Sequence, residues 1–145
     1  MAKSRNSRQE AIRNIVRNNA IRTQRELVEE LRDQGFVCTQ ATVSRDIADM
    51  GLRKLHEGMY VLAEDMHLQR MVSEFVVSLE DIESQVVIRS RAGTAPGVAA
   101  AIDAAELTGI AGTIAGNDTV LVICRGRERA SKTVKLMQQL RNYRK

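Results

Sequence analysis

Two helical segments separated by only four residues constrain the fold of this chain more than any other feature. Apolar residues recur with helical spacing from Leu27 to Leu31 and again from Val43 to Met50. Between the helices predicted around these residues lie Gly35 to Cys38. So short a connection keeps two helices adjacent and makes them cross at a steep angle. The sequence therefore predicts a helix-turn-helix motif.

Capping residues mark the ends of both helices. The run from Thr23 to Glu26 is a capping box, in which the threonine hydroxyl and the glutamate carboxylate satisfy free amides of the first turn. Gly35 is expected to end that helix. Thr39 is placed to cap the next helix and Gly51 to stop it.

A helix before this motif and a hairpin after it complete the predicted N-terminal domain. Apolar positions with helical spacing indicate a first helix that begins near Ser7 and reaches Val16. Residues 52–62 read as two short strands around a turn at Glu57 and Gly58. A hairpin behind three helices is a wing, so residues 1–63 are predicted to be a winged helix-turn-helix domain.

The second half of the chain predicts a separate domain. Residues 64–71 are polar with little apolar pattern, and we interpret them as a short linker to a domain spanning 72–145. Thr94 is expected to cap the first helix of that domain, with Pro96 in its first turn. The expected elements, in order, are strands at 75–80 and 86–88, that helix, strands at 110–115 and 120–124, and a closing helix whose apolar side carries Val134, Met137 and Leu140. This β-β-α-β-β-α order predicts a mostly antiparallel sheet with helices on one face, which makes the whole chain α+β.

Charge and cysteine content limit which partners and which cellular compartment are expected. The formal net charge is +4, and residues 1–25 hold seven Lys or Arg against Glu10 alone. This basic end favours a polyanionic partner, although ordinary solvated surface would have the same composition. Cys38 and Cys124 have no metal-ligand spacing around them, which indicates reduced thiols. No signal peptide or membrane-spanning run is present in the sequence, so we expect a cytoplasmic protein.

One face of the predicted third helix is suited to reading DNA. A helical wheel places it opposite Val43, Ile47 and Met50. An arginine there can offer a bidentate fork to guanine O6 and N7. A solvated amphipathic helix would show the same pattern, and that interpretation stays open. The face consists of Ala41, Ser44, Arg45 and Ala48, with Gln40 and Thr42 close enough to reach bases or phosphates.

Two strings in the sequence resemble motifs of the bacterial arginine repressor family. The run from Thr39 to Asp46, TQATVSRD, is similar to the family's recognition segment. The run from Gly112 to Thr119, GTIAGNDT, resembles its ligand-binding segment, which usually reads GTIAGDDT. Gly93-Thr94-Ala95 and Asp103 fall between them in the order expected, so the resemblance covers nearly the whole chain.

The resemblance implies a function and a set of site residues. Members of the family are winged-helix repressors of arginine metabolism genes, and their C-terminal domains form trimers that pair into hexamers. L-arginine binds between the trimers as corepressor and favours binding to palindromic operators. By the same resemblance, the DNA-binding residues are Gln40, Thr42, Ser44 and Arg45, and the L-arginine-binding residues are Asp103, Asn117 and Asp118.

Three departures from the family pattern leave an alternative open. Asn117 stands where the family usually has Asp, so one charge toward the guanidinium is missing. Pro96 replaces a frequent Gln, and the stretch from Tyr60 to Phe75 is shorter than in relatives. The alternative is a DNA-binding protein of the same fold whose ligand control is lost or altered, or which acts together with a second family member.

Enzymatic activity has no support in the sequence. His56 and His67 lie in the predicted wing and linker without the partners of a catalytic triad, so we expect surface residues. The glycines at 109, 112 and 116 match no phosphate-binding fingerprint. No metal site and no cofactor other than the corepressor are expected.

Overall fold

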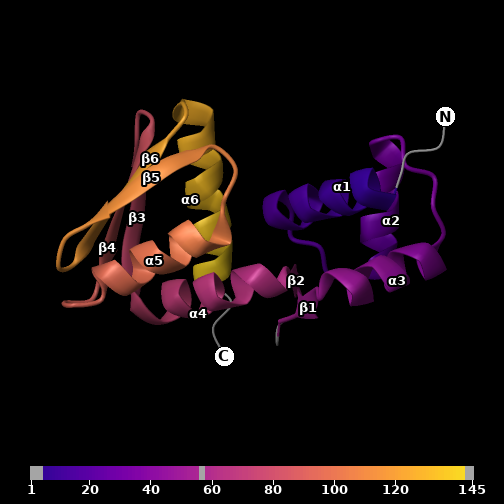
Figure 1. The fold of residues 1–145 in the computed structure, drawn as a ribbon, viewed down its shortest axis with the longest axis horizontal. Helices are drawn as coiled ribbons and strands as arrows, with labels where there is room; N and C mark the ends of the chain where they lie inside the picture. Colours follow the sequence, from indigo (N-terminus) through magenta and orange to yellow (C-terminus); the bar gives the residue numbers. More distant parts are fainter. Residues whose placement is uncertain (1–4, 56–57, 143–145) are drawn as a thin grey trace. The chain divides into compact units, whose positions relative to one another are not determined.

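The structure, a computed structural model, describes residues 5–55 and 58–142 of the chain. The chain divides into two compact units, residues 1–63 and 64–145 (Figure 1). Residues 56 and 57 lie outside the described part, and with them the expectations for His56 and for the Glu57 half of the hairpin turn. Each unit has its own core and is considered by itself.

The N-terminal unit contains the predicted three helices and hairpin. Its helices are α1 (Arg5–Asn18), α2 (Gln24–Asp33) and α3 (Gln40–Met50). They are followed by β1 (Arg53–Lys54) and β2 (Tyr60–Val61), which pair antiparallel. The backbone N–H of Tyr60 donates to the carbonyl of Ile21 and so ties the hairpin to the loop after α1.

Side-chain caps fix both helices of the motif, as the sequence predicts. The Thr23 hydroxyl accepts from the amide of Glu26 at 3.1 Å, and the Glu26 carboxylate accepts from the amide of Arg22 at 3.3 Å. The Thr39 hydroxyl accepts from the amide of Thr42 at 3.2 Å. α3 then ends at Gly51, whose φ of 68° is left-handed and therefore suits glycine.

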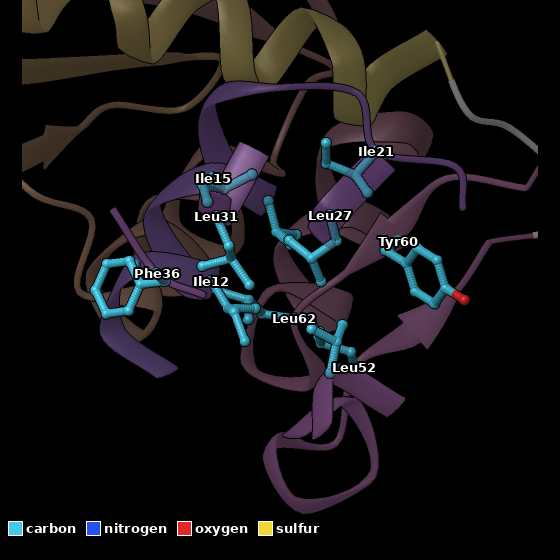
Figure 2. Close-up of a cluster of buried hydrophobic side chains, with 12 residues drawn as sticks. Ile12, Ile15, Ile21, Leu27, Leu31, Phe36, Leu52, Tyr60 and Leu62 are labelled. Carbon is cyan, nitrogen blue, oxygen red and sulfur yellow. The ribbon is translucent and has the colours of Figure 1, made fainter. Parts of the chain in front are cut away.

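An aliphatic cluster holds the N-terminal unit together. In Figure 2, side chains from α1, α2 and the segments that flank the hairpin point toward one another. Ile12, Leu27 and Leu31 are completely buried. Val43 of α3 is completely buried too, whereas Ile47 and Met50 are only partly buried against the cluster. The packing leaves the opposite side of α3 to solvent.

The predicted linker is helical instead of irregular. A short 3₁₀ turn, η1 (Ala63–Asp65), leads into α4 (Met66–Phe75), which belongs to the C-terminal unit. Leu68 and Val72, one turn apart, are buried against α5 and α6. The buried face also contains Gln69, whose side-chain amide donates to the carbonyl of Leu140 at 3.4 Å. The expectation of a short linker at 64–71 was wrong, because Leu68, Met71, Val72 and Phe75 recur with helical spacing and form the apolar side of this helix. His67 lies on it and is exposed.

The C-terminal unit has the predicted order of elements after α4. Its four strands are β3 (Val76–Ile82), β4 (Gln85–Ser90), β5 (Ile110–Ala115) and β6 (Thr119–Cys124). They form one antiparallel sheet in the order β3-β4-β6-β5. The α+β class expected from the sequence is confirmed.

The two helices of this unit that follow α4 cover the same face of the sheet. α5 (Ala95–Ala105) and α6 (Arg127–Asn142) contact the strands (Figure 1). Alternate strand residues point into this layer, and on β4 and β6 they are Val86, Ile88, Ser90, Val120, Val122 and Cys124, all buried. The other face of the sheet carries no helix from the described part of its own unit.

Two local expectations in this unit are corrected. Thr94 precedes α5 but does not cap it: its backbone is in the helical region, and its hydroxyl donates to the carbonyl of Arg91 at 2.6 Å. A threonine cap needs an extended backbone to aim its oxygen at the first amides. Phe75, expected to begin a strand, is the last residue of α4, and β3 begins at Val76.

Candidate functional site

The outward face of α3 presents the side chains that the sequence predicts for reading DNA. Gln40, Ser44 and Arg45 are exposed. Thr42 is half-buried, and its hydroxyl lies 3.0 Å from that of Thr39 within the helix cap. The structure therefore places three of the four predicted residues on an open surface and the fourth in the cap. Ala41 and Ala48, also exposed, leave the backbone of this face accessible to a groove floor.

A buried carboxylate on α3 was missed by the sequence analysis. Asp46 follows Arg45 and is 1% exposed. Arg8 of α1 holds it with two hydrogen bonds, Nε to Oδ2 at 2.5 Å and Nη2 to Oδ1 at 3.0 Å. The side-chain amide of Gln9 donates to Oδ1 at 3.3 Å. Asp46 therefore faces the interior while its neighbour Arg45 faces solvent.

The charges around this carboxylate decide its protonation. Burial raises the pKa of Asp46, but the hydrogen bonds from Arg8 and Gln9, together with the charges of Arg8 and Arg5, lower it further than burial raises it. Its pKa therefore lies below the ordinary value. In return, the hydrogen bond to Asp46 raises the pKa of Arg8. Both groups are ionised at neutral pH.

A second ion pair joins the same two helices. Arg5 Nη2 lies 2.6 Å from Asp49 Oδ2, and both side chains are largely exposed. Arg5 and Arg8 are three residues apart on α1, as Asp46 and Asp49 are on α3. Asp46 also falls on the stripe of Val43 and Met50, where an apolar residue would be expected. Two features of the sequence could have revealed the pair. Asp46 interrupts an apolar stripe of α3, and two arginines of α1 have the same three-residue spacing as the two aspartates of α3.

The wing adds basic side chains that the sequence analysis did not single out. Arg53 and Lys54 of β1 are exposed, and the ammonium of Lys54 lies 5.3 Å from the centre of the Tyr60 ring. Such side chains suit contacts to phosphate oxygens.

In the C-terminal unit, the predicted ligand residues Asn117 and Asp118 form the tip of the β5–β6 hairpin. Both are exposed, and the amide of Gly116 donates to the carbonyl of Thr119 at 2.8 Å. The tip is attached to the loop before α5 through the backbone of Asn117, whose carbonyl accepts from the amides of Gly93 and Ala95 at 3.1 and 3.3 Å. These contacts do not involve the Asn117 side chain. An aspartate there would keep the same turn.

The Asp118 carboxylate is hydrogen-bonded to the next residue of the hairpin. The Thr119 hydroxyl donates to Asp118 Oδ1 at 3.0 Å, and Arg89 Nη1 donates to the Thr119 hydroxyl at 2.9 Å. The carbonyl of Asp118 accepts from the amide of Ser90 at 2.8 Å. The carboxylate is thereby oriented while remaining open to solvent.

Asp103, the third predicted ligand residue, is not beside the other two. It is exposed on α5 and accepts from the Thr113 hydroxyl at 2.9 Å. It lies eight residues beyond Ala95, to which Asn117 is bonded, and at 1.5 Å per residue this is about 12 Å along the helix. Within one chain, the Asn117–Asp118 turn is therefore bonded to the start of α5, and Asp103 lies further along the same helix.

The described residues contain no candidate metal site and no membrane-spanning helix. Within 5–55 and 58–142, no group of three His, Cys, Asp or Glu could hold a metal ion. No helix in those ranges is long and apolar enough to cross a bilayer. Both cysteines are free, and burial raises the pKa of each thiol.

Comparison with known proteins decides the family. The family model "Arginine repressor, DNA binding domain" matches residues 3–68, and "Arginine repressor, C-terminal domain" matches residues 72–139. The chain belongs to the arginine repressor family. Its similarity to individual family members is also high. Proteins named "Arginine repressor" from Halothermothrix orenii and Carboxydothermus hydrogenoformans are 38% and 42% identical to it, covering 89% and 86% of this chain and 93% and 91% of theirs. One from Clostridium kluyveri is 40% identical over 92% of this chain and 96% of its own.

Membership of the arginine repressor family confirms the resemblance drawn from the two sequence strings. This arginine repressor family member is a DNA-binding transcription regulator and not an enzyme. Its α3 lies in the part matched by the DNA-binding model, and the Asn117–Asp118 turn lies in the part matched by the C-terminal model.

Proposed function

We propose that the chain represses genes of arginine metabolism in the cytoplasm by inserting α3 into palindromic operator DNA, with L-arginine as corepressor. The observation that carries the first half is the exposed polar face of α3, with Arg45 beside small side chains on a helix capped at both ends. Arg45 offers a fork to guanine, Gln40 an amide to adenine, and Ser44 a hydroxyl to a base or phosphate. Thr42 is assigned a phosphate contact through the first turn of the helix.

Removal of the Arg45 guanidinium tests whether α3 is the helix that reads bases. Arg45→Ala should lower the preference for a selected operator duplex over a scrambled one by roughly 10-fold or more, since a bidentate contact contributes about 1–3 kcal/mol of discrimination. The operator is a duplex that the unaltered protein itself selects from random sequences. Unchanged preference would show that α3 does not read bases through Arg45.

Arg53→Ala is the matched control in the wing. It removes the same charge from an exposed strand, so binding to both duplexes should weaken equally. The slope of log affinity against log salt should fall by about one for this variant.

For the second half of the proposal, we assign L-arginine to the turn at Asn117 and Asp118 and to Asp103. Within one chain, the turn at Asp118 is attached to the start of α5 and Asp103 lies further along that helix. We therefore propose that a second copy completes the site. A guanidinium that leaves water at such an interface needs a carboxylate partner, which Asp118 provides. This arrangement fits the expected trimers that pair into hexamers.

The uncovered face of the sheet is proposed to contact other copies. The strand register places Ile82, Ile123, Leu121 and Ile114 on this face, and the three isoleucines are 46%, 37% and 63% exposed. Exposed aliphatic side chains on one sheet face are typical of an oligomer interface. Sedimentation of Ile114→Lys should show smaller assemblies than sedimentation of the unaltered protein.

Titration with L-arginine separates this proposal from the alternative that ligand control has been lost. Binding heat together with a shift toward hexamers supports the corepressor role. No heat and no change of assembly at millimolar arginine would favour ligand-independent binding. The comparisons do not favour that alternative, because both family models match this chain. The replacement at Asn117 also leaves the backbone contacts of the turn intact.

A further inference from the structure

The ion pair between Arg8 and Asp46 occupies a position that apolar packing would ordinarily fill. Asp46 lies on the inward stripe of α3 between the buried Val43 and the half-buried Met50, and its side chain is 2% exposed. The side chain of Arg8 is 17% exposed. Removing two such charges from water opposes folding, and an apolar pair of similar size often gives equal or greater stability. Stability alone therefore does not explain the pair.

Direction distinguishes this pair from an apolar contact. Hydrophobic packing has no preferred angle, whereas a guanidinium and a carboxylate joined by two hydrogen bonds meet in one plane and one orientation. The contact with α1 uses both carboxylate oxygens of Asp46, and Gln9 adds a third bond. The rotation of α3 about its own axis is thereby fixed at Asp46.

Any such rotation also moves Arg45. It lies about 100° around the helix from Asp46, on the exposed side. With a radius of about 5 Å including side chains, a rotation of 10° moves a side-chain tip by roughly 1 Å. Hydrogen bonds to a base edge weaken steeply with errors of that size. The exposed pair of Arg5 and Asp49 restrains the same helix one turn further along.

We propose that the Arg8–Asp46 ion pair is a positioning device that sets the rotation of α3, so that Arg45 meets base edges in register. Arg8 and Asp46 are positioning residues that act through Arg45 and touch no DNA. Arg5 and Arg8 are neutralised by α3 itself, although they belong to the basic N-terminal end. This inference rests on the proposed reading role of α3.

A neutral replacement of the pair separates orientation from stability. Arg8→Met combined with Asp46→Leu, in the full chain, leaves the net charge unchanged and fills the same space with apolar groups. The melting temperature should stay equal or rise. The preference for the selected operator over the scrambled duplex should fall by about 10-fold, within the range of one bidentate base contact. Affinity for the scrambled duplex should not change.

The matched control removes a different ion pair from the same unit. Arg25→Met with Glu29→Leu replaces the exposed pair on α2, whose side chains are 86% and 63% exposed, and should leave the operator preference unchanged. Arg8→Lys keeps the charge without the fork, so its preference should lie between those of the unaltered protein and the apolar double variant.

The outcomes distinguish this inference from the proposed function. An operator preference within about 2-fold of the unaltered value in the folded double variant overturns the positioning role, since a displaced fork should cost more than that. Should the double variant not fold, Asp46→Asn decides instead: it keeps the shape and loses the charge, and an unchanged preference would equally overturn the role. Arg45→Ala is measured in parallel. If it too keeps the full preference, the assignment of the reading helix has failed, and not only its positioning.

Discussion

The two candidate sites of this chain differ in how much of each a single copy contains. The proposed reading face of α3 is complete within the N-terminal unit: its caps, its exposed side chains and its contacts with α1 all lie in residues 5–55. The proposed ligand residues of the C-terminal unit are divided between a hairpin tip and the far part of α5. The proposed DNA-binding surface therefore needs one chain, whereas the proposed arginine site needs residues from more than one copy.

The largest effect is expected from a substitution in the core of one unit that leaves the core of the other unit unaltered. Leu31→Ala removes a completely buried side chain from the N-terminal cluster and should cost about 2–5 kcal/mol of unfolding free energy. Calorimetry of the full chain should show that only the transition of the N-terminal unit moves to lower temperature. Leu140→Ala, in the core of the other unit, is the converse control. If either variant shifts both transitions together, the two cores are not independent.

The sequence predicted the first of these cores better than the borders of the second. Helical spacing of Ile12, Leu27 and Val43 and threonines ahead of two helices were sufficient, because both signals are local. α4 was missed although Leu68, Met71, Val72 and Phe75 recur with helical spacing, because the sequence analysis divided this run between a linker and a strand beginning at Phe75. Its buried amide, Gln69, finds its partner 71 residues away on α6.

Site residues show the same limit. The proposed reading face followed from a helical wheel of α3, but the burial of Asp46 depends on Arg8, 38 residues earlier, which a wheel of α3 alone does not include. Likewise, the sequence placed Asp103 and Asp118 together by resemblance alone. The structure shows where each is attached: the turn of Asp118 is bonded to the start of α5, and Asp103 lies eight residues beyond Ala95 and beside Thr113.

The next largest effect is expected on the pH dependence of stability. It tests whether the ion pair between Arg8 and Asp46 restrains the proposed reading face. With a pKa below the ordinary value in the folded state, Asp46 stabilises the unaltered protein above the pKa of the unfolded chain. That contribution is lost as the pH falls through the folded pKa. In Arg8→Met, burial without the arginine should raise the pKa of Asp46 above ordinary, and the sign reverses: acidification toward pH about 5 should then stabilise the variant.

The pH prediction is measured by urea unfolding of both proteins between pH about 4 and 7, the range in which a raised carboxyl pKa titrates. At neutral pH, Arg8→Met should be less stable by about 3 kcal/mol, because it leaves a buried charge without its partner. A variant whose stability falls in parallel with that of the unaltered protein on acidification would show that Arg8 does not hold the carboxylate ionised.

A smaller effect, on arginine binding, addresses the divided site. Asp118→Asn should weaken L-arginine binding by roughly 10-fold, since it removes a charge-assisted hydrogen bond. Asn117→Asp should strengthen binding several-fold, because the turn keeps its backbone bonds while a second carboxylate is added. The added charge should also make hexamers depend more strongly on arginine. Titration calorimetry with sedimentation measures both, and Glu106→Gln, at the end of α5, is a neutralised control. Equal affinities in all three variants would remove the turn from the ligand site.

The smallest effect compares the helix starts of the two units. Thr39 accepts from the amide of Thr42, so Thr39→Ala should cost about 1 kcal/mol of unfolding free energy through a lost N-cap. Thr94 looks equivalent in sequence, but its hydroxyl donates to the carbonyl of Arg91 and caps no amide of α5. Thr94→Ala should therefore cost about half as much, the lower end for one neutral hydrogen bond. Thr39→Ser and Thr94→Ser, which keep the hydroxyls, are the matched controls in denaturant unfolding. Equal losses at the two positions would mean that Thr94 caps α5 in solution, and that the start of this helix, where Asn117 is attached, is held as firmly as the start of α3.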